Sequence, residues 1–342
     1  MENKDLTLSF NNNNNNNTLN YPLLSDKEFN VKIEKKKEFN EIFEKNNFSL
    51  EEINKLNKDN ITFTLNSQQL FIRNFLSLNT PYNNLLLYHG LGTGKTCTSI
   101  TVSMEKIKYM SLTNQKNKIL VVANPNVQDN FKKELFSEDK LKIINGEWRL
   151  LTCVGNDILS FVNFTNEKID KEKLISRINF FISEWFIFVG YTKFSNIITT
   201  SIKSDKINDR FDNSLVIIDE IHNIRMSDDS KNKRIAENLV SLVKKTENMQ
   251  LLLLSATPMF DNFKEIVWLV NLMNLNDKRP IMSIKDVFDE GGNFKINKEG
   301  EESGLKNFVR KITGYVSFVQ GEDPINFPFR IFPTDYDLSN SI

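Results

Sequence analysis

Short apolar runs recur along the chain and are separated by longer segments of mixed character. The runs stand at residues 85–88, 119–123, 186–190, 215–218 and 251–254. Continuous apolar runs of this length are typical of strands that are buried on both faces of a parallel sheet. Segments between them, such as 96–110 and 126–136, carry apolar residues at helical spacing. This alternation predicts an α/β fold, with a parallel sheet and helices on both of its faces.

The connections in such a fold determine where a ligand would bind. Parallel strands are joined by crossovers, so their carboxyl ends lie along the same edge of the sheet. We therefore expect binding and catalytic residues to follow the strands directly. Three motifs meet this expectation, after the runs that end at residues 88, 218 and 254.

Outside the repeated apolar runs the chain changes in composition. Residues 1–25 contain an unbroken run of asparagines, which can bury no apolar surface, and we expect a disordered tail. Residues 26–60 are charged with scattered apolar positions, and they predict a helical arm. The main lobe is expected over residues 61–275. Residues 276–342 are expected to be an irregular segment that leads toward a second lobe. Within it we expect a helix at 305–312 and an extended, irregular end at 314–338, which is rich in prolines and aromatics.

The composition narrows the choice of function. Lys and Arg together number 44, as do Asp and Glu, so a nucleic-acid site would have to be a local patch. No apolar run is long enough to span a bilayer and the amino terminus does not resemble a signal peptide, so we expect no membrane contact. The two cysteines, Cys97 and Cys153, are too few for a disulfide framework or a four-thiolate zinc site. We expect both to be reduced thiols in an intracellular protein.

The first motif follows the run at 85–88 and reads HGLGTGKT, from His89 to Thr96. Glycines let the chain turn its amide groups inward around a polyphosphate, and the following helix directs its amino terminus at the same group. Lys95 would bridge the β- and γ-phosphates, and Thr96 would ligate Mg²⁺. The usual motif opens with glycine, and His89 stands in that place. The expected nucleotide-binding residues are Gly90, Leu91, Gly92, Thr93, Gly94, Lys95 and Thr96.

Two adjacent carboxylates, Asp219 and Glu220, follow the run at 215–218 and form the second motif. Asp219 would complete the Mg²⁺ shell, and Glu220 would polarise an attacking water as general base. Together with Lys95 they are the predicted catalytic residues. A glutamate in this place weighs against small-molecule kinases, which need no activated water. His222 could sense the nucleotide or link to a later motif, although a lone histidine is more often structural.

The third motif, Ser255-Ala256-Thr257-Pro258, follows the run at 251–254. Taken alone it is better explained as a helix-capping loop. In this order, each after a strand, GxGKT, DEIH and SAT resemble the first motor lobe of the superfamily 2 DExH helicases and translocases. The flanks at 65–96 and 314–333 resemble a viral branch close to the Swi/Snf-type ATPases. That branch includes poxvirus nucleoside triphosphatase I, the small subunit of the poxvirus early transcription factor and helicases of large DNA viruses.

The resemblance covers residues 61–342 and implies a RecA-like P-loop ATPase lobe. It implies ATP and Mg²⁺ as cofactors, DNA or RNA as a partner, and a place in the virion or the host cytoplasm. Gln69 stands where such proteins contact adenine. The residues that would couple hydrolysis to movement are His222, Ser255 and Thr257. Those that would contact a nucleic-acid backbone are Asn124, Asn126 and Thr192.

Motors of this kind need a second lobe, which supplies an arginine finger. The residues after Thr257 contain no second set of apolar runs followed by an arginine motif. Arg279, Arg310 and Arg330 lack that context. We therefore expect a first lobe only, with its partner lobe in cis or in trans, and weak or no ATPase activity of this chain alone.

The leading prediction is an ATP-dependent helicase or translocase that acts in viral transcription or DNA handling. One alternative is a non-enzymatic, nucleotide-binding transcription-factor subunit that recruits a viral RNA polymerase. Another is a P-loop nucleotide hydrolase unrelated to nucleic acids. The choice between DNA and RNA, the polarity of movement, and unwinding as against tracking stay open.

Overall fold

The computed structural model describes residues 21–44, 65–163, 169–224, 230–259, 262–298 and 300–319. The asparagine run and the second half of the predicted arm lie outside the described residues. So does the segment that follows residue 319. What was expected of those segments therefore stays a prediction.

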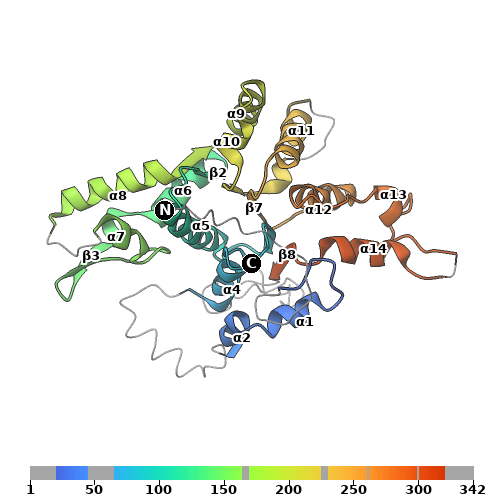
Figure 1. Cartoon of the computed structure of the whole chain (residues 1–342), viewed down its shortest axis with the longest axis horizontal. Coiled ribbons are helices and arrows are strands. Elements are labelled where there is room, and N and C mark those ends of the chain that lie inside the picture. Colours follow the sequence, from blue (N-terminus) through green and yellow to red (C-terminus); the bar gives the residue numbers. More distant parts are fainter. Residues whose placement is uncertain are drawn as a thin grey trace, which may run out of the picture.

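Six parallel strands form the central sheet, in the order β5-β2-β6-β7-β1-β8. Figure 1 shows the sheet among the surrounding helices. The bounds of the strands are Asn84–His89 for β1, Ile119–Val122 for β2, Phe186–Val189 for β5, Leu215–Ile218 for β6, Gln250–Ser255 for β7 and Val316–Val319 for β8. The predicted parallel α/β fold is confirmed, because five of these strands coincide with the five apolar runs.

Helices cover both faces of the sheet, as predicted. One face carries α4 (Ser67–Phe75), α5 (Lys95–Leu112), α6 (Pro125–Leu135), α7 (Asp157–Val162) and α8 (Lys171–Trp185). The other face carries α9 (Tyr191–Lys203), α10 (Ile207–Phe211), α11 (Ser230–Lys245), α12 (Lys264–Asn276), α13 (Ile284–Val287) and α14 (Ser303–Ile312). In the described part of the chain, no helix combines the length and the apolar character needed to cross a membrane.

Strand β1 shows why continuous apolar runs were a reliable signal. Successive side chains of a strand point to opposite faces of the sheet. Leu85 and Leu87 join the core on the α5 face, whereas Leu86 joins the core on the α12 face. All three are buried. Burying a leucine side chain contributes about 1.5–3 kcal/mol, so a strand that is apolar on both sides is stable only between two layers of helices.

Two short helices at the amino end pack against the lobe. They are α1 (Phe29–Glu34) and α2 (Lys37–Glu44). The ring centroids of Phe39 and Phe71 are 4.8 Å apart, and those of Phe29 and Tyr82 are 5.4 Å apart. The described part of this segment is therefore docked on α4 and the start of the sheet through aromatic contacts.

Three further strands were not predicted. Strands β3 (Leu141–Ile144) and β4 (Glu147–Leu150) form an antiparallel hairpin. Its turn is Asn145-Gly146, with φ of 53° and 82°, and Asn-Gly is a hairpin signal that was present in the sequence. Strand β8 lies within the segment expected to be irregular, and it pairs with β1 at the edge of the main sheet. It has four residues, partly exposed, so no apolar run marks it.

Candidate functional site

Five strand ends bring the predicted site residues to one edge of the sheet. Strand β1 leads into the glycine-rich loop, β6 is followed by Asp219, and β7 ends at Ser255. Strands β2 and β5 lead into α6 and α9, whose starts carry Asn124 and Thr192. Because these strands pair in parallel, their carboxyl ends meet at this edge.

The loop from Gly90 to Gly94 has a backbone suited to enclosing a phosphate. Gly92 and Gly94 have φ of 76° and 79°, in the left-handed region that glycine adopts at little cost. A Cβ atom at Gly94 would lie 2.7 Å from Gln69 Nε2, closer than a side chain can approach without displacing it. Thr93 Oγ1 donates to Gly90 O at 2.9 Å and closes the turn. Glycine is therefore favoured at position 94 by its backbone angle, and any larger residue would also have to displace the end of the Gln69 side chain.

Helix α5 begins directly after this loop. Its N-cap is Gly94, and no side chain caps the first turn. The first amide groups of a helix have no partners within the helix, and they carry the positive end of its dipole. The start of α5 therefore presents N–H groups to the loop in the arrangement that phosphates bind.

The Lys95 ammonium folds back over the loop. Its Nζ atom donates to His89 O and to Gly90 O, at 2.9 Å each. Burial lowers the pKa of Lys95, and the nearby charges of Glu220 and Asp219 oppose that shift. The cation is thus close to both predicted acids while its hydrogen bonds go to backbone carbonyls. Phosphate oxygens are stronger acceptors for a cation than carbonyls are, so a triphosphate would draw the ammonium away.

Asp219 and Glu220 are held close together in a partly buried loop. Burial raises the pKa of Asp219 to about 6, the charge of Glu220 adds to the rise, and Lys95 opposes it. Glu220 has φ of 45° and ψ of 55°, a left-handed conformation that is uncommon for a glutamate. Its Oε2 atom is buried and makes no hydrogen bond within the described part of the chain. Two neighbouring carboxylates in such surroundings favour the approach of a cation.

His222 connects the acidic motif to the third motif. Its Nδ1 atom lies 3.0 Å from Ser255 Oγ and 3.1 Å from Glu220 Oε2, the latter without hydrogen-bond alignment. Ser255 Oγ also accepts from the amide of Thr257 at 3.0 Å. The structure therefore brings the three predicted coupling residues into one chain of contacts that begins at Glu220.

Gln69 lies beside the loop and is 6% exposed. The backbone N–H of Gln69 donates to Asn66 Oδ1 at 2.8 Å, and the side-chain Oε1 atom of Gln69 accepts from the backbone N–H of Asn66 at 3.0 Å. This reciprocal pair is a capping box that begins α4. It holds the Nε2 atom of Gln69 against Gly94. The contact of Gln69 with adenine stays a prediction.

A magnesium ion fits this edge only in combination with phosphate. Across the described ranges of the chain, no cluster of three or more His, Cys, Asp or Glu side chains could hold a metal. The Thr96 hydroxyl and the Asp219 carboxylate are oxygen donors of the kind that Mg²⁺ takes together with phosphate oxygens and water. The donor set therefore suits a magnesium–nucleotide complex rather than a separate metal centre.

The predicted nucleic-acid residues are exposed. Asn124, Asn126 and Thr192 lie at the starts of α6 and α9. Tyr191, next to Thr192, donates from its hydroxyl to Asp219 O at 2.8 Å. The start of α9 is therefore tied to the acidic loop, and exposed polar side chains flank the site.

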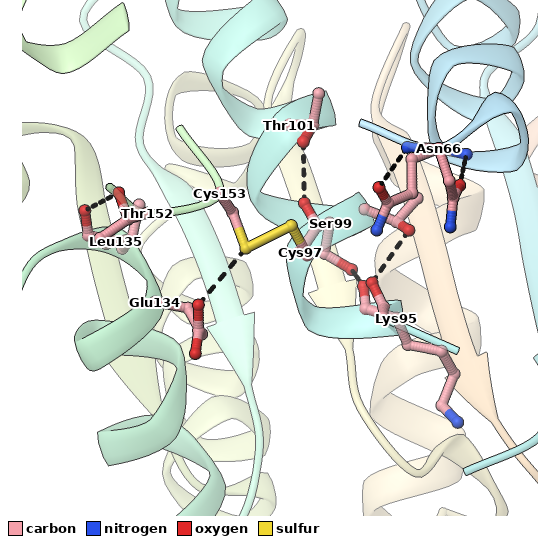
Figure 2. The surroundings of a disulfide bond; sticks show 12 residues. Asn66, Lys95, Cys97, Ser99, Thr101, Glu134, Leu135, Thr152 and Cys153 are labelled. Atoms are coloured by element: carbon pink, nitrogen blue, oxygen red, sulfur yellow. Dashed lines mark hydrogen bonds between the residues drawn. A yellow bond between two sulfur atoms is a disulfide. The ribbon is translucent and has the colours of Figure 1, made fainter. Parts of the chain in front are cut away.

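The prediction of two reduced thiols is wrong for this structure. Cys97 and Cys153 form a disulfide, with their Cα atoms 5.4 Å apart (Figure 2). Cys97 lies in the first turn of α5 and Cys153 follows β4, 56 positions later. Figure 2 shows the Lys95 side chain extending away from the sulfur atoms. The disulfide therefore joins the first turn of the phosphate-loop helix to the segment that follows the hairpin. The spacing of two cysteines so distant in sequence does not predict this pairing.

Comparison with known proteins assigns the chain to a family. The family described as "Type III restriction enzyme, res subunit" matches residues 61–260. A protein of Acanthamoeba polyphaga mimivirus named "Putative ATP-dependent RNA helicase" is 30% identical over 268 residues, which are 76% of this chain and 41% of that protein. "Nucleoside triphosphatase I" of Melanoplus sanguinipes entomopoxvirus is 25% identical over 295 residues, covering 84% of this chain and 38% of that protein.

A third relative is an "Early transcription factor large subunit homolog" of African swine fever virus, 23% identical over 330 residues, covering 78% of this chain and 28% of that protein. The chain thus spans less than half the length of each of these three relatives. The family match includes Gln69, the phosphate loop, the acidic pair and the Ser255–Thr257 motif. The predicted resemblance to superfamily 2 helicases with viral relatives is confirmed. The chain belongs to the helicase-type ATPase family described by the res subunit of type III restriction enzymes.

Proposed function

We propose that the chain is the ATP-binding lobe of a nucleic-acid helicase or translocase. The observation that carries the proposal is the convergence of one ammonium and two carboxylates on a glycine-rich loop. Lys95 donates only to backbone carbonyls in the described part of the chain, although Asp219 and Glu220 lie close enough to oppose the lowering of its pKa. These groups fit a triphosphate accompanied by a divalent cation.

Binding would rearrange the loop more than the sheet. The Lys95 ammonium would exchange the His89 and Gly90 carbonyls for phosphate oxygens. Thr96 and Asp219 would hold Mg²⁺, which supplies charge neutralisation at the phosphates when it is bound. The amide groups at the start of α5 would donate to the same phosphates.

Glu220 is the proposed general base. A base must offer a free oxygen within reach of the water that it activates. The Glu220 Oε2 atom makes no hydrogen bond within the described residues. Its neighbour His222 would carry the change in charge at hydrolysis to Ser255 and Thr257 through the contacts described above.

A complete motor would need a second lobe, in cis or in trans. Among the candidate arginines, Arg279 lies 5.4 Å from the centre of the Tyr315 ring and Arg310 donates to Asn307. Arg330 lies outside the described residues. Because an arginine finger contributes about 10³–10⁵ in rate, we expect slow hydrolysis by this chain alone. DNA or RNA would bind across Asn124, Asn126 and Thr192.

The second candidate is a nucleotide-binding transcription-factor subunit that recruits a viral RNA polymerase. The similarity to the protein named as an early transcription factor large subunit homologue supports it. Both candidates imply action inside the infected cell or the virion. They differ in one result, because recruitment by an adaptor would survive the loss of ATP binding.

Fluorescence anisotropy with a labelled ATP analogue and Mg²⁺ tests the proposal. Removing a charge-assisted hydrogen-bond donor costs about 1.5–3 kcal/mol, so Lys95→Ala should weaken binding by about 10- to 100-fold. Lys108→Ala is the matched control, since Lys108 lies on the same helix and pairs with Asp157 at 3.1 Å. Equal affinity of the Lys95→Ala variant and the wild type, or no binding by either, would contradict the proposal.

A further inference from the structure

His89 touches two parts of the lobe at once. It is the last residue of β1, and only 1% of its surface is exposed. Its carbonyl accepts a hydrogen bond from Lys95 Nζ at 2.9 Å. Its ring Nε2 atom lies 2.9 Å from Ser317 Oγ on β8. One residue therefore contacts both the lysine that would bind phosphate and the strand at the edge of the sheet.

Strand β8 is held to the lobe along one side. In the described sheet it pairs with β1 alone. Ser317 is paired with Leu87, so it lies diagonally across from His89 on the same face. On the opposite face, the Tyr88 and Phe318 ring centroids are 4.9 Å apart. A short edge strand is stabilised by few contacts. The hydrogen bond to His89 therefore contributes a larger share of the local stability of β8 than it would in a central strand.

The His89 ring is neutral in this position. Burial and the nearby charge of Lys95 lower its pKa to about 4. A neutral imidazole has one donor and one acceptor nitrogen, and a serine hydroxyl can donate or accept. The hydrogen bond between His89 and Ser317 can therefore form in either tautomer and does not depend on pH near neutrality.

We propose that His89 is a positioning residue that couples occupancy of the phosphate loop to the order of β8. The inference rests on the proposed function, because a triphosphate has to draw Lys95 Nζ away from His89 O. Phosphate oxygens would bind the loop amides that directly follow His89, and these several bonds would restrain His89 more than the one bond from Lys95 that it loses. The His89 ring would then hold Ser317 more firmly. Glycine, the residue usual at this place in the motif, has no side chain and cannot make this link. Strand β8 would then pass the nucleotide state on toward the carboxyl-terminal part of the chain.

Hydrogen–deuterium exchange of the full chain, with and without a non-hydrolysable ATP analogue and Mg²⁺, tests this coupling. Two segments are followed, the loop at 90–96 and β8 at 316–319. In the wild type we expect the analogue to slow exchange in both segments, by about fivefold in β8, the lower end of usual couplings between sites. In Ser317→Ala the slowing should persist in the loop and disappear from β8.

Two further variants distinguish coupling to the nucleotide from a stabilisation of β8 by His89 that does not depend on the nucleotide. His89→Gly should lose the response of β8, and His89→Gln, which places a hydrogen-bonding group at similar reach, should recover it. Ser111→Ala is the matched control, because Ser111 is an exposed serine on α5 whose hydroxyl donates to Lys108 O. It should respond as the wild type does. A merely structural role of His89 would speed exchange in β8 equally with and without the analogue, and that result would overturn the inference.

Two other results would also decide the matter. If the analogue still slows exchange of β8 in both His89→Gly and Ser317→Ala, the inference is contradicted and the proposed function is not. The same holds if β8 of the wild type does not respond to the analogue while the loop is protected. Protection of neither segment would remove the proposed function, and the inference with it.

Discussion

Two partly buried aspartates lie near opposite edges of the same sheet. Asp219 follows β6 at the carboxyl edge, among the candidate site residues. Asp277 follows α12 at the amino edge, next to Asn276, whose Nδ2 donates to Asn84 Oδ1 at the start of β1 at 2.8 Å. Burial raises the pKa of both carboxyls. The two differ in what surrounds them.

The chain supplies Asp277 with partners of its own. The Tyr315 hydroxyl donates to Asp277 Oδ2 at 2.7 Å, and this bond and the Arg279 charge oppose the rise in pKa. At Asp219 the neighbouring Glu220 charge adds to the rise in pKa, and the Lys95 charge and a hydrogen bond from the Glu220 backbone oppose it. Burial of an acid therefore does not mark a site by itself. A carboxyl that is partly buried beside a like charge is the better candidate for a site, because a bound cation would relieve the repulsion between the two charges.

The largest expected effect is on turnover at the carboxyl edge. Glu220→Gln removes the proposed base and keeps the size of the side chain, so hydrolysis should fall about 10²–10⁴-fold while analogue binding persists. Because the chain alone should hydrolyse slowly, the measurement is a single-turnover assay with protein in excess over labelled ATP. Glu237→Gln, on the exposed face of α11, is the control. Equal hydrolysis rates in Glu220→Gln and Glu237→Gln would show that Glu220 is not the general base.

The disulfide should stabilise the carboxyl-edge region strongly. Closing a loop of 56 residues contributes about 4 kcal/mol in the chain-entropy model. Reduction of the wild type should therefore lower its free energy of unfolding by about that amount, as measured by urea titration. Cys153→Ser should already be destabilised and should not respond to reductant. Coincident urea curves for oxidised and reduced wild type would show that the bond adds nothing.

The amino-edge aspartate should matter for stability and not for nucleotide binding. Asp277→Ala leaves the Tyr315 hydroxyl without its acceptor, which should cost about 2–3 kcal/mol. Asp277→Asn keeps an acceptor and should cost less. Thermal unfolding and analogue titration of the folded variants measure the two effects. Loss of nucleotide binding at temperatures where Asp277→Ala is folded would break the distinction between the two edges.

The smallest effect should be a gain in stability at Asp219, and it should depend on pH. The pKa of Asp219 in the folded chain, about 6, is above its ordinary value of 3.8. Its negative charge therefore opposes folding, with no cost below about pH 4 and the full cost above pH 6. In Mg²⁺-free buffer, Asp219→Asn should match the wild type at pH 4 and exceed it by about 2 kcal/mol at pH 7.5. A variant less stable than the wild type at pH 7.5 would show that Asp219 is satisfied as Asp277 is.

The strands and motifs could be predicted because their signals are local. A run such as 215–218 identifies a buried strand without knowledge of its neighbours. The residues that directly follow the strand then lie at the carboxyl edge of the sheet. The Asn145-Gly146 turn carried a local signal as well, although the hairpin around it was not predicted. Strand β8 carried no local signal, because its four residues are partly exposed and are held as a strand by pairing with β1.

By itself, the sequence determined the parallel sheet, the order of the three motifs and the types of charged group that they bring to one edge. These depend on residues close together in the chain, where side-chain spacing sets the secondary structure. Only the tertiary structure decided which distant groups meet: Cys97 with Cys153, His222 with Ser255, and His89 with Ser317. The physical reason is that these contacts depend on how crossovers place the strands, and no spacing along the chain encodes that placement directly.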